Sequence, residues 1–116
     1  MYIGQLNEEG KPDGLGQKIW KSGARYDGYW RNDERQGSGA MQTDDKSFYI
    51  GQWGDDMKDG YGAHFTMEGH VYIGDFRDDK MHGKGKYTWP DQSYYEGEWR
   101  NGLRDGKGSM QFSGKS

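Results

Sequence analysis

The chain has 116 residues, of which 30% are hydrophobic and 16% aromatic, and its formal net charge is −3. This length allows one domain, and the aromatic content favours a folded chain, since disordered chains are poor in aromatic residues. The chain has no cysteine, which excludes a disulfide scaffold, a cysteine-ligated zinc site and a thiol nucleophile. The negative net charge argues against nucleic acid as a partner.

One pattern recurs along the chain: Tyr-x-Gly-x-aromatic, then a polar segment, then Gly-x-Gly. Its copies start at Tyr2, Tyr26, Tyr49, Tyr72 and Tyr95, at spacings of 24, 23, 23 and 23 residues. A fixed period of this length indicates a repeat protein. We therefore interpret 1–116 as one array with copies at about 1–25, 26–48, 49–71, 72–94 and 95–116, and we expect it to be an excerpt from a longer protein.

The first copy departs from the others. It has one more residue before its Gly-x-Gly, and Leu6 occupies the position of Trp30, Trp53, Phe76 and Trp99 in the later copies. Terminal repeats are often atypical because one side of them faces solvent. The segments that link one copy to the next are short and polar, as expected for turns.

The last copy shows the structure expected of each. The alternating segment from Tyr95 to Trp99 predicts a strand, and Asn101-Gly102 predicts a type I′ turn, whose two central residues need positive φ. We expect the return strand to open with Gly-x-Gly. The second, third and fourth copies have aspartate at the position of Gly102, namely Asp33, Asp56 and Asp79, and aspartate tolerates the left-handed conformation well enough for those turns to form.

Strand alternation assigns the residues to two faces. Residues i, i+2 and i+4 share a face, so the repeat tyrosine, glycine and Trp or Phe lie on one face, and the opposite face is mainly polar. We expect the strand glycines to leave a patch on which an aromatic ring lies flat, so that Gly51→Val abolishes cooperative unfolding. The glycines assigned this structural role are Gly28, Gly37, Gly39, Gly51, Gly60, Gly62, Gly74, Gly83, Gly85, Gly97, Gly106 and Gly108.

A single hairpin is only marginally stable in water, so the five hairpins must stack into one sheet. The predicted fold class is all-β: an elongated single-layer antiparallel sheet of five stacked hairpins. Ten strands about 4.8 Å apart give a length of about 45–50 Å.

The array resembles the MORN (membrane occupation and recognition nexus) repeat family over its whole length. The resemblance implies a non-enzymatic scaffold that binds a peptide or helix of a protein partner or self-associates, often at cytoskeletal or ciliary structures. The sequence has no apolar run long enough to span a membrane and no secretory segment, so we expect a cytoplasmic location, and the resemblance adds association with the cytoskeleton or a membrane. Phosphoinositide binding has been proposed for similar arrays.

The aromatic face carries the functional hypothesis. In one interpretation its rings form only the thin core of the sheet. In the other, a single layer cannot cover its own aromatic face, and exposed Trp and Tyr form a docking groove. The unpaired outer strands offer a second route, through edge-to-edge self-association. The residues predicted to contact a protein partner are Tyr26, Trp30, Tyr49, Trp53, Tyr72, Phe76, Tyr87, Trp89, Tyr95 and Trp99.

Two alternatives remain open. An anionic membrane surface is one, through basic residues towards the C-terminus, although a net charge of −3 weakens it. Carbohydrate is the other, because hairpin arrays rich in Gly, Trp and Tyr resemble bacterial choline- and glucan-binding repeats. Those repeats run nearer 20 residues and favour aromatic doublets. The basic residues in question are Lys84, Lys86, Arg100, Arg104 and Lys107.

The sequence offers little support for catalysis, a cofactor or a metal. None of the five Gly-x-Gly pairs has the third glycine of a dinucleotide fingerprint. His64, His70 and His82 occupy different repeat positions and join no cluster of metal-ligand spacing. The paired aspartates lack the spacing of a calcium loop. We therefore expect a protein that is not an enzyme and needs no cofactor.

Overall fold

The computed structural model describes residues 1–113, which form ten β-strands. Each hairpin contributes two consecutive strands. The strands are β1 (Tyr2–Leu6), β2 (Pro12–Ile19), β3 (Arg25–Arg31), β4 (Glu34–Gln42), β5 (Phe48–Gly54), β6 (Met57–Phe65), β7 (Val71–Arg77), β8 (Lys80–Thr88), β9 (Tyr94–Arg100) and β10 (Leu103–Gln111).

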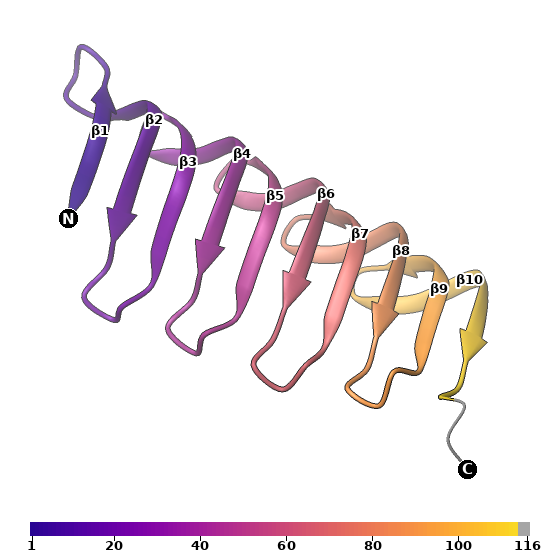
Figure 1. Ribbon diagram of the computed structural model, residues 1–116. Coiled ribbons are helices and arrows are strands. Elements are labelled where there is room, and N and C mark those ends of the chain that lie inside the picture. The colour runs from indigo at the N-terminus through magenta and orange to yellow at the C-terminus, as the bar shows by residue number, and fades with distance from the viewer. Residues whose placement is uncertain (114–116) are drawn as a thin grey trace.

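The strands form one open antiparallel sheet in which each pairs with its neighbours in chain order. They lie side by side from β1 at one end to β10 at the other (Figure 1). The Cα atoms span 58 × 26 × 16 Å. The predicted all-β, elongated single-layer sheet is confirmed, and its length is of the expected order.

The four later hairpins turn through two residues, as predicted. In the last, Asn101 has φ 48° and Gly102 φ 85°; in the second, Asn32 has φ 47° and Asp33 φ 69°. Aspartate therefore takes the left-handed position that glycine takes in the last copy. The first hairpin uses a longer turn, in which the Asn7 carboxamide oxygen accepts the backbone N–H of Glu9 at 2.9 Å.

The return strands differ from the prediction, because they begin directly after the turn rather than at Gly-x-Gly. In the second hairpin Arg35 pairs with Trp30 and Gly39 with Gly28, so three residues of β4 lie opposite the single residue Tyr29. Gly37, at the centre of this bulge, has φ 73°. Glycine adopts that conformation without steric cost, so the first glycine of each Gly-x-Gly serves the bulge.

The second glycine of each Gly-x-Gly serves the ring. In the third hairpin Gly62 pairs with Gly51, and the ring of Tyr49 occupies the space into which a Cβ on Gly62 would project. A Cβ on Gly51 would lie 2.5 Å from the Cα of Gly62 and 2.7 Å from the carbonyl oxygen of Tyr61. Because neither glycine has a side chain, the two strands and the Tyr49 ring can pack closer together than a Cβ at either position would allow.

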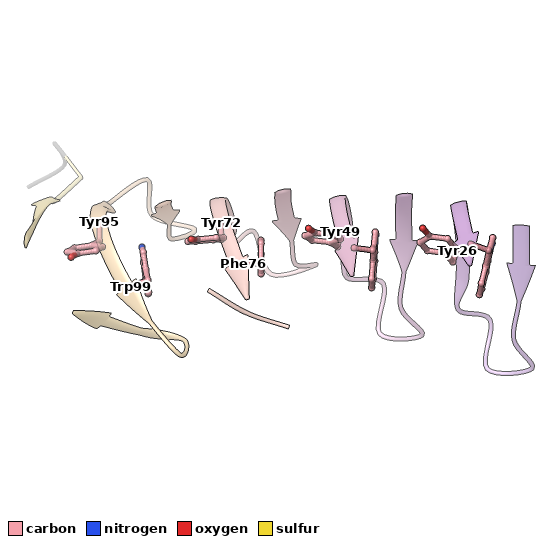
Figure 2. Packing of buried hydrophobic residues seen from close by; sticks show 8 residues of the cluster. Tyr26, Tyr49, Tyr72, Phe76, Tyr95 and Trp99 are labelled. Atoms are coloured by element: carbon pink, nitrogen blue, oxygen red, sulfur yellow. The ribbon is translucent and has the colours of Figure 1, made fainter. Parts of the chain in front are cut away.

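The core is one line of aromatic rings that crosses the strands (Figure 2). Each ring meets the next edge to face: Trp53 lies 5.1 Å from Tyr49 of its own repeat and 5.3 Å from Tyr26 of the preceding repeat, at 89° and 90°. Edge-to-face pairs add roughly 0.5–1.5 kcal/mol beyond area burial. The line of rings therefore joins every repeat to its neighbours.

The polar atoms of these rings are bonded to the backbone. The Tyr49 hydroxyl donates to the carbonyl of Gln52 at 2.9 Å, and the Trp53 indole N–H donates to the carbonyl of Gly39 at 3.1 Å. Burial also raises the pKa of Tyr26 to about 12, so its hydroxyl remains a donor at neutral pH. These backbone bonds fix the tyrosine and tryptophan rings in position.

Candidate functional site

Eight of the ten residues predicted to contact a partner lie in the core, each with 7% or less of its surface exposed. The expectation that a single layer leaves these rings uncovered is therefore wrong: each ring is covered by the edges of its neighbours and by the glycine pair beneath it. Truncation of Trp53 tests the fold rather than binding. The remaining two, Tyr87 and Trp89, are half-buried and pack against the core; their contact with a partner stays a prediction.

Half-buried apolar side chains flank the line of rings on the same face. Tyr87 pairs with Tyr72 on one neighbouring strand and Tyr95 on the other, and its ring centroid lies 4.9 Å from that of Trp89. We name this set the aromatic-face strip. It consists of Trp20, Met41, Met81, Tyr87 and Trp89.

The residue that lies opposite the repeat tyrosine changes from repeat to repeat, whereas the tyrosine does not. The return-strand residue that pairs with the repeat tyrosine is Lys18, Met41, His64, Tyr87 or Met110 in the five hairpins. The tyrosine itself is the same in all five. The array thus presents a variable outer layer on a constant support.

A hollow of about 320 Å³ opens in this face between the third and fourth repeats. Tyr72 and Phe76 contribute to its wall from the core. Burial and the nearby Lys58 ammonium lower the pKa of His64, another wall residue. The lining residues are Lys58, His64, Thr66, Tyr72, Phe76, Asp79, Lys80, Met81, Tyr87 and Gly102.

The two-residue turns of consecutive hairpins are hydrogen-bonded to one another. The backbone N–H of Asp56 donates to the carbonyl of Arg35 at 3.2 Å, and that of Asp79 donates to the carbonyl of Lys58 at 3.0 Å. The Asp56 carboxylate also accepts the backbone N–H of Arg35 at 3.0 Å and its Nε–H at 2.6 Å. Turn aspartates therefore connect repeats as well as shape the turn.

This ion pair gives a pH-dependent contribution to stability. Burial alone raises the pKa of the Asp56 carboxyl, but hydrogen bonds from the Arg35 side chain and backbone outweigh it, and the pKa is lowered. Because the folded-state pKa lies below the unfolded value of about 3.9, the contribution is present above that pH. It is lost as the pH falls through the folded-state pKa.

We expect Asp56→Asn to lower the free energy of unfolding by about 1 kcal/mol at pH 7, since the pair is partly exposed. The difference from the parent should shrink as the pH falls below about 4. Urea unfolding at pH 7 and pH 3 measures both. Asp55→Asn, in the same turn, is the control and should leave stability unchanged at both values. A difference that is the same at pH 7 and pH 3 contradicts this account.

The opposite face differs from the mainly polar surface that was predicted. Ile50, Tyr61 and Ile73 lie there with 50%, 63% and 42% of their surfaces exposed. A larger hollow, of about 790 Å³, begins at Tyr61 and Ile73 and extends to β10. Charged side chains of both signs line the rest of it, among them Lys84 and Glu98. Both faces therefore present a hollow, but only the aromatic face presents a strip packed on the core.

A sequence model of the MORN repeat matches five consecutive segments: residues 2–25, 26–47, 49–63, 72–94 and 95–116. The chain belongs to the MORN repeat family. The matched segments follow the hairpins of the structure, with the repeat tyrosines at or near their starts. No curated protein matches this MORN array.

Membership gives the MORN array a broad functional class. MORN repeats are non-enzymatic and occur in scaffolds that bind proteins or membranes. Residues 1–113 contain no helix able to span a membrane and no group of three histidine or acidic side chains placed to hold a metal ion. The hollows on the two faces give a partner room to bind on the described part of the chain.

Proposed function

We propose that this MORN array is a scaffold that binds an extended or helical segment of a partner protein along the aromatic-face strip. The observation that supports this most strongly is that the aromatic face combines a constant buried residue with a variable residue opposite it. The repeat tyrosine is the same in all five hairpins, whereas the return-strand residue that pairs with it is Lys18, Met41, His64, Tyr87 or Met110. Tyr and Trp that lie partly exposed on a rigid support are typical hot-spot residues.

Membrane binding has weaker support. The basic residues Lys84 and Lys86 share their hollow with Glu96 and Glu98, so no polybasic patch forms there. Anionic lipid surfaces attract clusters of Lys or Arg. The net charge of −3 also disfavours binding to an anionic membrane. A protein segment therefore fits the surface better than a lipid headgroup does.

The test is a selection of random peptides displayed on phage against the array, followed by affinity measurements. We expect Trp89→Ala to lower the affinity for the selected peptides at least tenfold, because loss of a hot-spot side chain costs about 2 kcal/mol or more of binding free energy. Tyr61→Ala, on the opposite face, should change the affinity less than twofold. If Tyr61→Ala removes binding and Trp89→Ala does not, the partner lies on the opposite face and the proposal is wrong.

A further inference from the structure

At one position of the repeat, a basic side chain is paired with a carboxylate in one hairpin and not in the next. This position is that of the return-strand residue that pairs with the repeat's Trp or Phe, and Arg35 and Lys58 occupy it in the second and third hairpins. The Arg35 guanidinium is bonded to the Asp56 carboxylate. Within residues 1–113, the Lys58 ammonium has no carboxylate within 4.0 Å. The second repeat neutralises its cation, and the third repeat does not.

The chemistry of the two side chains explains the difference. Asp79 holds the place that Asp56 holds for Arg35, and its carboxylate accepts the backbone N–H of Lys58 at 2.7 Å. Arginine can bond the same carboxylate through Nε, close to its stem, whereas lysine carries its only nitrogen at the end of four methylenes. The Lys58 ammonium therefore extends past Asp79 and lies 5.5 Å from the ring centroid of Tyr49 and 5.8 Å from that of Phe76.

The unpaired ammonium lines the hollow between the third and fourth repeats. His64 and Tyr87 lie in the same wall. Burial is the main influence on Lys58 and lowers its pKa; the nearby Asp79 carboxylate acts against this, and Arg35 lowers the pKa further. A half-buried cation without a partner is costly, and a carboxylate that hydrogen-bonds to it offsets that cost. The hollow offers space for such a group next to the aromatic-face strip.

We propose that this hollow binds an aspartate or glutamate side chain of the partner segment, with the Lys58 ammonium donating to its carboxylate. The inference rests on the proposed function and adds the chemistry of one partner residue. Met81 and Tyr87 supply apolar walls, which suit the methylene stem of an acidic side chain. Lys58 and Lys80 are the two cations of this hollow, and the net charge of the array is −3, so a single acidic side chain complements the site better than an anionic membrane does.

The experiment extends the peptide selection with the variant Lys58→Met. Methionine occupies the equivalent position in the next repeat, at Met81, so the substitution keeps an unbranched side chain and removes the ammonium group. We expect peptides selected on the parent array to carry Asp or Glu at one fixed position. Changing that residue to Asn or Gln should weaken binding to the parent about tenfold or more, because hydrogen bonds to charged groups are worth about 1.5–3 kcal/mol.

The Lys58→Met array should bind the acidic and the amide peptides equally well. Lys84→Met, on the opposite face, is the control and should keep the parent's preference. Binders that show no acidic preference, or a preference that Lys58→Met retains, overturn this inference and leave the proposed function standing. A selection that yields no binder overturns both. Binding to vesicles with anionic lipid that depends on Lys58, without an acidic preference in peptides, also overturns it and assigns the site to lipid.

Discussion

Gly51→Ala is expected to abolish cooperative unfolding of the array. The added Cβ would lie 2.5 Å from the Cα of Gly62 and 2.7 Å from the carbonyl oxygen of Tyr61. Both are backbone atoms of the paired strand, so no rotamer change relieves the contact. The strand pair must separate, and the Tyr49 ring that lies on it must move. We expect a loss of about 3 kcal/mol or more in the free energy of unfolding.

The control for this substitution lies in the same strand. A Cβ on Gly54 would come no closer than 3.4 Å, to the Asp59 side chain, so Gly54→Ala should change stability by less than about 1 kcal/mol. Urea unfolding followed by tryptophan fluorescence compares the two. If Gly51→Ala and Gly54→Ala give the same midpoint, close backbone approach is not the reason for the glycine.

Trp53→Ala is expected to separate the array into two weakly coupled parts. The Trp53 ring packs against Tyr26 of the second repeat as well as Tyr49 of its own, and its indole donates to the carbonyl of Gly39. Truncation removes all three contacts, of which those with Tyr26 and Gly39 lie at the boundary between the second and third repeats. Removing a buried Trp costs about 3–5 kcal/mol. Because each repeat contacts only its neighbours, the two sides should then unfold less cooperatively.

The matched variant is Trp53→Phe, since phenylalanine stands at the equivalent position in the fourth repeat, Phe76. It should keep a ring against both tyrosines and lose mainly the indole hydrogen bond, worth about 1 kcal/mol. The measurement is the slope of the urea transition, which falls when cooperativity is lost. A transition in Trp53→Ala as steep as that of the parent would contradict a role in coupling the repeats.

The architecture was predictable because the same sequence pattern recurs in each repeat. The period, the alternation of Tyr49, Gly51 and Trp53, and the turn at Asn101 all point to the same stacked hairpins. The start of the return strand was not predictable in this way. An interpretation by composition treats the residues between the turn and Gly-x-Gly as loop, whereas in the structure Arg35 and Lys58 already pair with the previous strand.

That shift also explains why part of the candidate site was missed. Lys58 and Met81 enter the aromatic face only because the bulge centred on each first glycine places them opposite Trp53 and Phe76. That glycine recurs in every repeat, but its recurrence does not show that its φ is positive, because the φ depends on pairing across the hairpin. Burial was missed for a different reason. Whether a ring on a single layer is covered depends on its distance from rings in neighbouring repeats, and periodicity does not give that distance.

Because every strand pairs with the next in chain order, equivalent positions are evenly spaced along the array. Equivalent positions recur after two strands, which is about 10 Å at a strand spacing of about 4.8 Å. An extended partner advances about 3.3 Å per residue and would meet successive repeats with every third residue. A helical partner advances 1.5 Å per residue and would meet them about every six to seven residues. The sequence of a bound segment should therefore carry a period that reveals its own conformation.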